Sequence, residues 1–236
     1  MARMARFIVP GFVHHVEQHS SLDAPVFRSD GDYKKYLSLL AEHALEKGVS
    51  IWAYCILPHS IHLVVVPRDE EALSSMIRDV HAFYSAYYNL TYDHSGTLWR
   101  GRFQSCVVDD LLVMTAVRLV ECHPAHLGLV DRAEKYEWSS AAAHSSREEH
   151  PFLEKSFPPP DMRDNWPSFL KESTQAEALE EQLQMYTRTG RPWGTLEFLL
   201  GLEKQYNRSL IPRKRGRKPK QKNNDDGVSV EDETEE

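Results

Sequence analysis

Two apolar runs rich in β-branched and aromatic residues follow each other closely in the first third of the sequence. They are "VSIWAYCIL" (49–57) and "IHLVVV" (61–66), and only "PHS" separates them. So short and turn-like a connection between two β-rich runs predicts a hairpin. Because strands joined by a tight turn run antiparallel, the chain must build on an antiparallel sheet.

Helical patterns alternate with these strands. In "RSDGDYKKYLSLLAEHALEKG" apolar residues recur at helical spacing, with Ser29 or Asp30 suited to begin the helix and Gly48 to end it. A second amphipathic helix is expected from about Glu70 to Asn89. A third is expected in "DLLVMTAVRLVECHP", stopped by Pro124.

Three further short strands are expected in "RFIVP", "FVHHVEQ" and "FQSCVVD". The order β-β-α-β-β-α-β-α then predicts an α+β fold, with an antiparallel sheet packed with helices. After about Ser145 the pattern weakens, and "KSFPPPDMRDNWP" is typical of a linker. The predicted parts are a folded domain, a linker with a short helix, a small helical extension and a disordered tail, at 1–150, 151–185, 186–211 and 212–236.

The predicted tail divides into two blocks of opposite charge. "PRKRGRKPKQK" holds seven cations and no acid, and "NNDDGVSVEDETEE" holds seven acids and no cation. The net charge of −7 therefore conceals a basic arm suited to nucleic acid. Three widely spaced cysteines, no apolar run of membrane-spanning length and no signal-peptide pattern predict a cytoplasmic protein, without disulfides or contact with a membrane.

An ordered set of segments resembles the REP-associated tyrosine transposases, which belong to the single-tyrosine HUH transposases of the insertion-sequence 200 superfamily. The segments run from "FIVPGFVHHVEQ" through "WAYCILPHSIHLVVVP", "GTLWRGRFQS", "ECHPAHLGLV" and "EWSSAAAH" to "TRTGRPWGTLEFLLGLE". The resemblance implies the ferredoxin-like HUH fold, a hairpin or single-stranded DNA partner, a nucleoid-associated place in the cytoplasm and either a monomer or a homodimer.

The resemblance also implies a mechanism. Two histidines on one strand face hold a divalent metal, Mg²⁺ or Mn²⁺, which polarises the scissile phosphate. A helix tyrosine attacks that phosphate and forms a covalent phosphotyrosine link. A polar side chain one turn after the tyrosine often completes the metal site.

When the family pattern is aligned with this chain, two residues that the mechanism needs are replaced. The second metal histidine corresponds to His62, the first to Ser60, the nucleophile to Leu119 and the later polar ligand to His123. Leucine cannot attack phosphorus, and serine is a poor substitute for imidazole on a borderline metal. A residual metal site is one alternative, with His62 and His123 meeting across a strand–helix interface and Ser60 or water completing it. The favoured alternative is that both are ordinary partly buried histidines. His14 and His15 are expected on the strand surface, with the approach of one of them to the same pocket left open.

DNA-binding candidates lie outside this site. Arg100 and Arg102 flank a glycine turn beside Trp99 and Phe103, where phosphate contact or a purely structural turn are both possible. The "TRTGRP" turn offers Arg188 and Arg191, and the tail resembles an AT-hook core. The tail residues selected as DNA contacts are Arg213, Lys214, Arg215, Arg217 and Lys218.

The sequence thus predicts a transposase-derived protein that binds hairpin or single-stranded DNA and does not cleave it. The alternative is an active metal-dependent tyrosine transposase or single-strand endonuclease with a rearranged site. A third possibility is a structural or regulatory domain whose acidic tail shields its own basic arm. Tyr84, Tyr87 and Tyr88 recur at helical spacing, which is more typical of a core than of a catalytic group.

Overall fold

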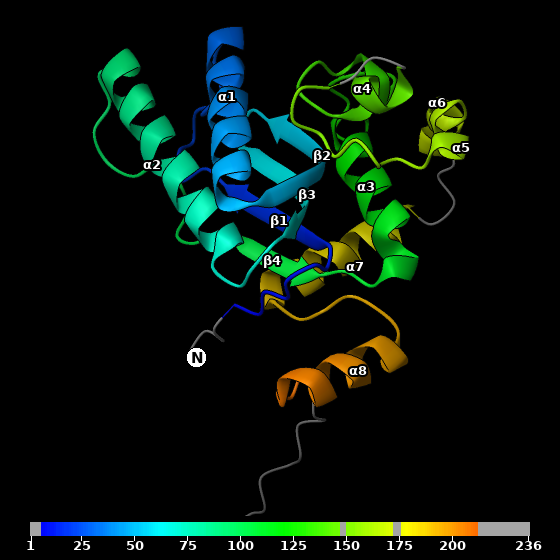
Figure 1. Ribbon diagram of the computed structural model, residues 1–236. Helices are drawn as coiled ribbons and strands as arrows, with labels where there is room; N and C mark the ends of the chain where they lie inside the picture. Colours follow the sequence, from blue (N-terminus) through cyan, green and yellow to red (C-terminus); the bar gives the residue numbers. More distant parts are fainter. Residues whose placement is uncertain (1–5, 147–149, 172–175, 212–236) are drawn as a thin grey trace, which may run out of the picture.

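A computed structural model describes residues 6–146, 150–171 and 176–211. A four-stranded antiparallel sheet lies at the centre of the protein (Figure 1). The strand order is β2-β3-β1-β4. Helices cover both faces, which confirms the predicted α+β class. The strands are β1 (His14–His19), β2 (Val49–Leu57), β3 (Ser60–Pro67) and β4 (Gln104–Val107).

The predicted hairpin is formed by β2 and β3, with Leu57 paired to Ser60 across the turn. Successive side chains of a strand alternate between faces. Ile61, Leu63 and Val65 therefore enter one core cluster, and Val64 enters the other. His62 and Ser60 share the face of Val64.

Two helices cover the face of Leu63. They are α1 (Asp30–Lys47) and α2 (Ala72–Tyr92). Ser29 begins α1 through a capping box with Asp32, and Gly48 ends it in the left-handed conformation at φ 69°. An aromatic-rich core fills the space between this pair and the sheet.

The opposite face is covered mainly by α3 (Val113–His126), with α6 (Trp166–Lys171) and α7 (Ala176–Thr189) beside it. The prediction that Pro124 stops the third helix is wrong, because α3 continues to His126. Pro124 lies only two residues before the helix end and is buried, so the hydrogen bond that proline cannot donate is lost only in the last turn.

The remaining helical segments are short. They are the 3₁₀ turns Asp110–Leu112 and Ala133–Lys135, with α4 (Ala141–Ser145) and α5 (Pro160–Arg163). Within the described ranges, the helices are too short or too polar to cross a membrane.

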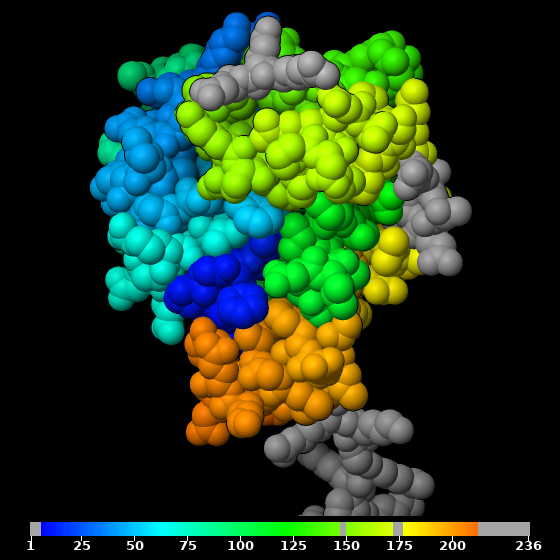
Figure 2. All heavy atoms as spheres, turned by 45° about the vertical axis from the view of Figure 1, so that its right-hand side comes forward, coloured from blue at the N-terminus to red at the C-terminus, as the bar shows by residue number. Residues whose placement is uncertain are grey.

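The N-terminal segment differs from the prediction. "RFIVP" is not a strand, because β1 already pairs with β3 and β4 on its two sides. Phe7 and Val9 instead join Leu202 in a third apolar cluster. Leu202 belongs to α8 (Leu196–Tyr206), which Thr195 caps and which lies below the sheet in the view of Figure 1. Its atoms form the orange part of the surface in Figure 2.

Candidate functional site

Polar side chains gather on the sheet face that α3 and α7 cover. His15, Glu17 and His19 alternate along β1, and Ser60 and His62 alternate along β3. The strand register places Glu17 opposite His62 and His19 opposite Ser60. The sequence prediction passed over Glu17 and His19, although their period-two spacing with His15 was a usable signal.

Helix α3 brings the next two residues of the predicted site to this face. The ring of His123 lies 4.5 Å from that of His62, measured between centroids. Leu119 precedes His123 by four residues, so both lie on one side of the helix. Leu119 is 3% exposed, and α3 contains no tyrosine. The structure therefore brings together all four positions that the family pattern selects.

Helix α7 closes the cluster from the side. Thr187 donates its hydroxyl to the carbonyl of Leu183 and lies 2.7 Å from Nδ1 of His15, so Nδ1 is the donor in that pair. Nearer the start of α7, the carboxylate of Glu180 lies 3.2 Å from Nδ1 of His126 through Oε2 and 3.9 Å from Nε2 of His123 through Oε1. These contacts connect three imidazoles of the site region to a helix far away in the sequence.

The charges in the cluster follow from burial and hydrogen bonding. Burial lowers the pKa of His62 well below its usual value, with repulsion from His123 adding to the effect, and burial lowers the pKa of His15 to about 4. Burial would raise the pKa of Glu17, but the hydrogen bond with His19 and the other nearby histidines lower it to about 2. At neutral pH the cluster thus holds a charged Glu17 between neutral His15 and His62.

These residues do not fit a metal ion in their present arrangement. Nε2 of His62 lies 3.1 Å from the hydroxyl of Ser60, and Nε2 of His19 is hydrogen-bonded to Glu17. In the part of the chain that the structure describes, no three His, Cys, Asp or Glu side chains are placed to ligate one ion together. The donors bind one another instead.

The melting temperature should therefore be indifferent to Mg²⁺, Mn²⁺, Zn²⁺ and a chelator. An ion at a hundred times its Kd would add about 2.7 kcal/mol of stability. That corresponds to a rise of roughly 5–10 °C for a chain of this size. Thermal melts with each additive measure it. A rise in the wild type that His62→Ala and His123→Ala both abolish would show that the residual site is real.

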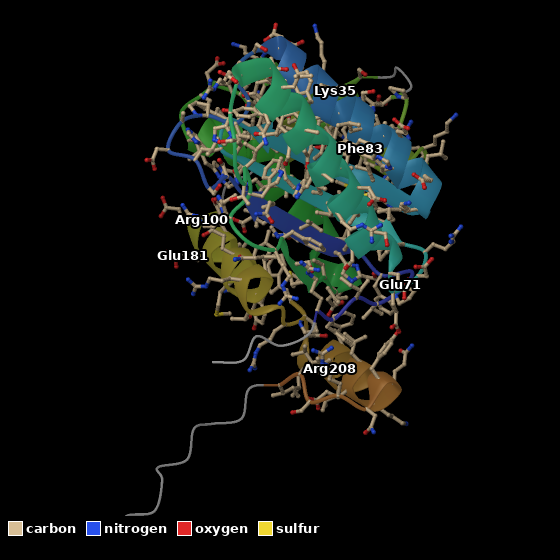
Figure 3. All side chains as sticks on the ribbon, turned by 90° about the vertical axis from the view of Figure 1, so that its left-hand side faces the viewer. Lys35, Glu71, Phe83, Arg100, Glu181 and Arg208 are labelled. Atoms are coloured by element: carbon tan, nitrogen blue, oxygen red, sulfur yellow. The ribbon has the colours of Figure 1, made fainter. Side chains whose placement is uncertain are left out.

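The basic turn predicted to touch DNA lies at the end of β1. The backbone N–H of Arg100 donates to the carbonyl of His19, and Gly101 provides the left-handed turn at φ 66°. The side chains of Arg100 and Arg102 are exposed. Trp99 is a core residue, stacked on His81 at 4.1 Å between ring centroids. Arg100 and Glu181 of α7 project from the same edge of the protein in the view of Figure 3.

The other basic candidates are spread over the C-terminal part. Arg188 is exposed near the end of α7, and Arg191 donates to the carbonyl of Leu210. The five tail candidates lie outside the described residues: Arg213, Lys214, Arg215, Arg217 and Lys218.

The tyrosines of α2 belong to the core on the opposite face of the sheet. The hydroxyl of Tyr84 donates to the carbonyl of Val26, and that of Tyr87 donates to Asp32. Tyr88 is fully buried in the same core cluster. On the face of His62, Tyr186 of α7 packs against the cluster that contains Leu119, and the sequence prediction did not consider it.

Comparisons with known proteins support the fold. The chain resembles the solved structure of a REP-associated tyrosine transposase bound to a REP hairpin, at TM-score 0.53 and 14% identity, over 65% of this chain and 92% of the other. It also matches a candidate transposase from Deinococcus radiodurans R1 at TM-score 0.36 and 13% identity, over 54% of this chain and 94% of the other. No protein-family model and no curated protein sequence matches. The first likeness confirms the resemblance to the transposases at the level of the fold.

Proposed function

We propose that this protein is a transposase-derived DNA-binding protein that recognises hairpin or single-stranded DNA without cleaving it. The fold alone does not determine the activity, because one fold supports many functions. The choice rests on the residues at the positions where the family mechanism needs a nucleophile and a metal.

The observation that carries the proposal is the buried Leu119 on α3. It lies one helical turn before His123, whose ring contacts that of His62, so it occupies the place from which a tyrosine would reach the phosphate. An aliphatic side chain has no atom that can form a phosphoester bond. Because Ser60 stands at the position of the first metal histidine, His62 is the only one of the two strand imidazoles that is present. Both the nucleophile and the metal site of the family mechanism are therefore incomplete.

DNA binding is supported by the fold and by the position of the basic turn. The solved transposase with this fold is bound to a REP hairpin. Here the N–H of Arg100 donates to the carbonyl of His19, so Arg100 stands at the end of the strand that carries the polar cluster. Arg102 is also exposed, and it lines a pocket toward α2 with Arg78 and His81. Cations at that place suit the phosphates of a strand passing the site.

Arg100→Ala and Arg102→Ala should each weaken binding of hairpin-bearing single-stranded DNA several-fold and reduce the salt slope by about 0.7–0.9. Fluorescence anisotropy of the full chain with a labelled oligonucleotide, over a series of salt concentrations, measures both quantities. Lys35→Ala is the matched control, because Lys35 is an exposed cation on α1, on the opposite face of the sheet. Equal affinity in all four proteins would contradict a role for the turn.

The alternative function is cleavage by a rearranged site. Its support is the density of imidazoles on one face, together with Tyr186 on the helix that closes it. A covalent adduct separates the two functions, because binding alone leaves none.

A further inference from the structure

A second polar site lies on the other side of α3. Successive residues of a helix are about 100° apart, so Glu121 points away from the side that carries Leu119. Glu121 is fully buried and accepts three hydrogen bonds: from Ser140 Oγ at 2.5 Å, from His144 Nδ1 at 2.6 Å and from Trp166 Nε1 at 2.8 Å. Three donors therefore surround this one buried carboxyl group.

This arrangement fixes the orientation of His144. Its Nδ1 carries a proton for Glu121, and its ring is held between Phe157 and Trp166 in edge-on contacts at 5.5 Å and 5.2 Å. The other ring nitrogen, Nε2, is buried and has no hydrogen-bond partner among the described residues. A buried polar atom without a partner costs about 1–3 kcal/mol, which makes it a sign of a ligand.

His144 lines a cavity of about 90 Å³ between α4, α5 and residues 150–158, and Nε2 is the polar atom that it has left to present there. His150 lines the same cavity and also has a buried ring nitrogen, Nδ1, without a partner among the described residues. The volume equals that of about three water molecules, at about 30 Å³ each, which leaves room for a tetrahedral oxyanion. The segment that bounds it forms the yellow-green surface in Figure 2.

The charge around the cavity favours an anion. Lys155 and Arg163 line it, and the one acid among the described residues of the lining, Glu154, uses Oε1 to accept from Ser156. A phosphate group near neutral pH offers both O–H donors and anionic acceptor oxygens, so it can pair with Nε2 of His144 as a donor or as an acceptor. A cation at Nε2 would instead lie beside the positive charges of Lys155 and Arg163.

We propose that this cavity binds a phosphate group, with Nε2 of His144 as its buried contact and Lys155 and Arg163 at its rim. The group is either the free ion or the terminal phosphate of a DNA strand, which share the same tetrahedral oxygens. The site does not depend on the proposed function, because it uses none of the residues of the Leu119 face.

Isothermal titration calorimetry of the full chain with inorganic phosphate tests the proposal. We expect saturable binding that His144→Phe weakens by about tenfold or more, since a charge-assisted hydrogen bond is lost. Lys155→Met, an exposed change that leaves the core intact, should weaken it by about threefold. Lys35→Met is the matched control and should bind as the wild type does.

If His144→Phe does not fold, the Lys155→Met variant and the NMR signals of the imidazole nitrogens in the wild type still test the proposal. Phosphate should move the nitrogen signal of one imidazole whose other nitrogen is protonated. Competition by an oligonucleotide with a 5′-phosphate, and not by the same strand without it, would identify the strand end as the source. Competition by neither strand would identify the free ion. Absence of saturable phosphate binding, equal binding by Lys155→Met, or binding of Zn²⁺ that phosphate does not displace would overturn the proposal.

Discussion

The unmodified protein should form no covalent adduct with hairpin-bearing single-stranded DNA in Mg²⁺ or Mn²⁺. Leu119 supplies no attacking oxygen, and Ser60 leaves His62 without the second imidazole that would hold the ion. A phosphotyrosine link survives denaturation, so a denaturing gel with labelled DNA detects it as a shifted band. The expected result is no shifted band at any concentration at which the DNA is bound.

Single reversions should fail for separate reasons. Leu119→Tyr provides the nucleophile but leaves the phosphate poorly polarised, and Ser60→His provides the second imidazole but no nucleophile. The double variant should recover an adduct, because the ring of His123 already lies 4.5 Å from that of His62. Tyrosine is larger than leucine at a buried position, so each variant needs a thermal melt as a folding control.

An adduct from the unmodified protein would refute the inactive interpretation. Its position, mapped by mass spectrometry, would then name the nucleophile. Tyr186 is the first candidate, because it packs on the same side of the sheet as Leu119. Tyr84 and Tyr92 are less suited, because both hydroxyl groups donate to partners in the opposite layer.

Local pattern was enough to predict the hairpin and the side of the sheet on which His62 lies. Period-two alternation places His62 with Ser60 and Val64, and the structure has them on one face. The resemblance selected Leu119 and His123, and the predicted helix that contains them is α3 in the structure. These predictions succeeded because each depends on a single element and its repeat.

The other contacts of the site join residues from different elements, and the pattern within one element cannot predict such pairs. Glu17 meets His62 only through the register of β1 against β3, and Thr187 meets His15 across 172 residues of sequence. The buried pair of Glu121 and His144 also depends on how α3 and α4 pack. Pro124 shows the converse, since the local preference for a helix end is overridden for two more residues, to His126.

Deletion of residues 212–222 should have the largest effect on the salt dependence of DNA binding. That segment carries seven cations and no acid. If all seven contact phosphates, the slope of log affinity against log salt should flatten by up to about five to six units, at about 0.7–0.9 per contact. The affinity loss is therefore greatest at low salt. Anisotropy titrations of both chains from low to physiological salt measure it.

The acidic block provides the internal control. Deleting only residues 223–236 removes seven acids and leaves every cation of the arm in place. If these acids compete with DNA for the arm, the shorter chain should bind more tightly than the full one, most of all at low salt, where charges are least screened. A slope that the first deletion leaves unchanged would show that the arm does not touch DNA. Binding would then rest on the folded part alone, where the backbone of Arg100 is bonded to His19 and Arg102 is exposed on the same turn.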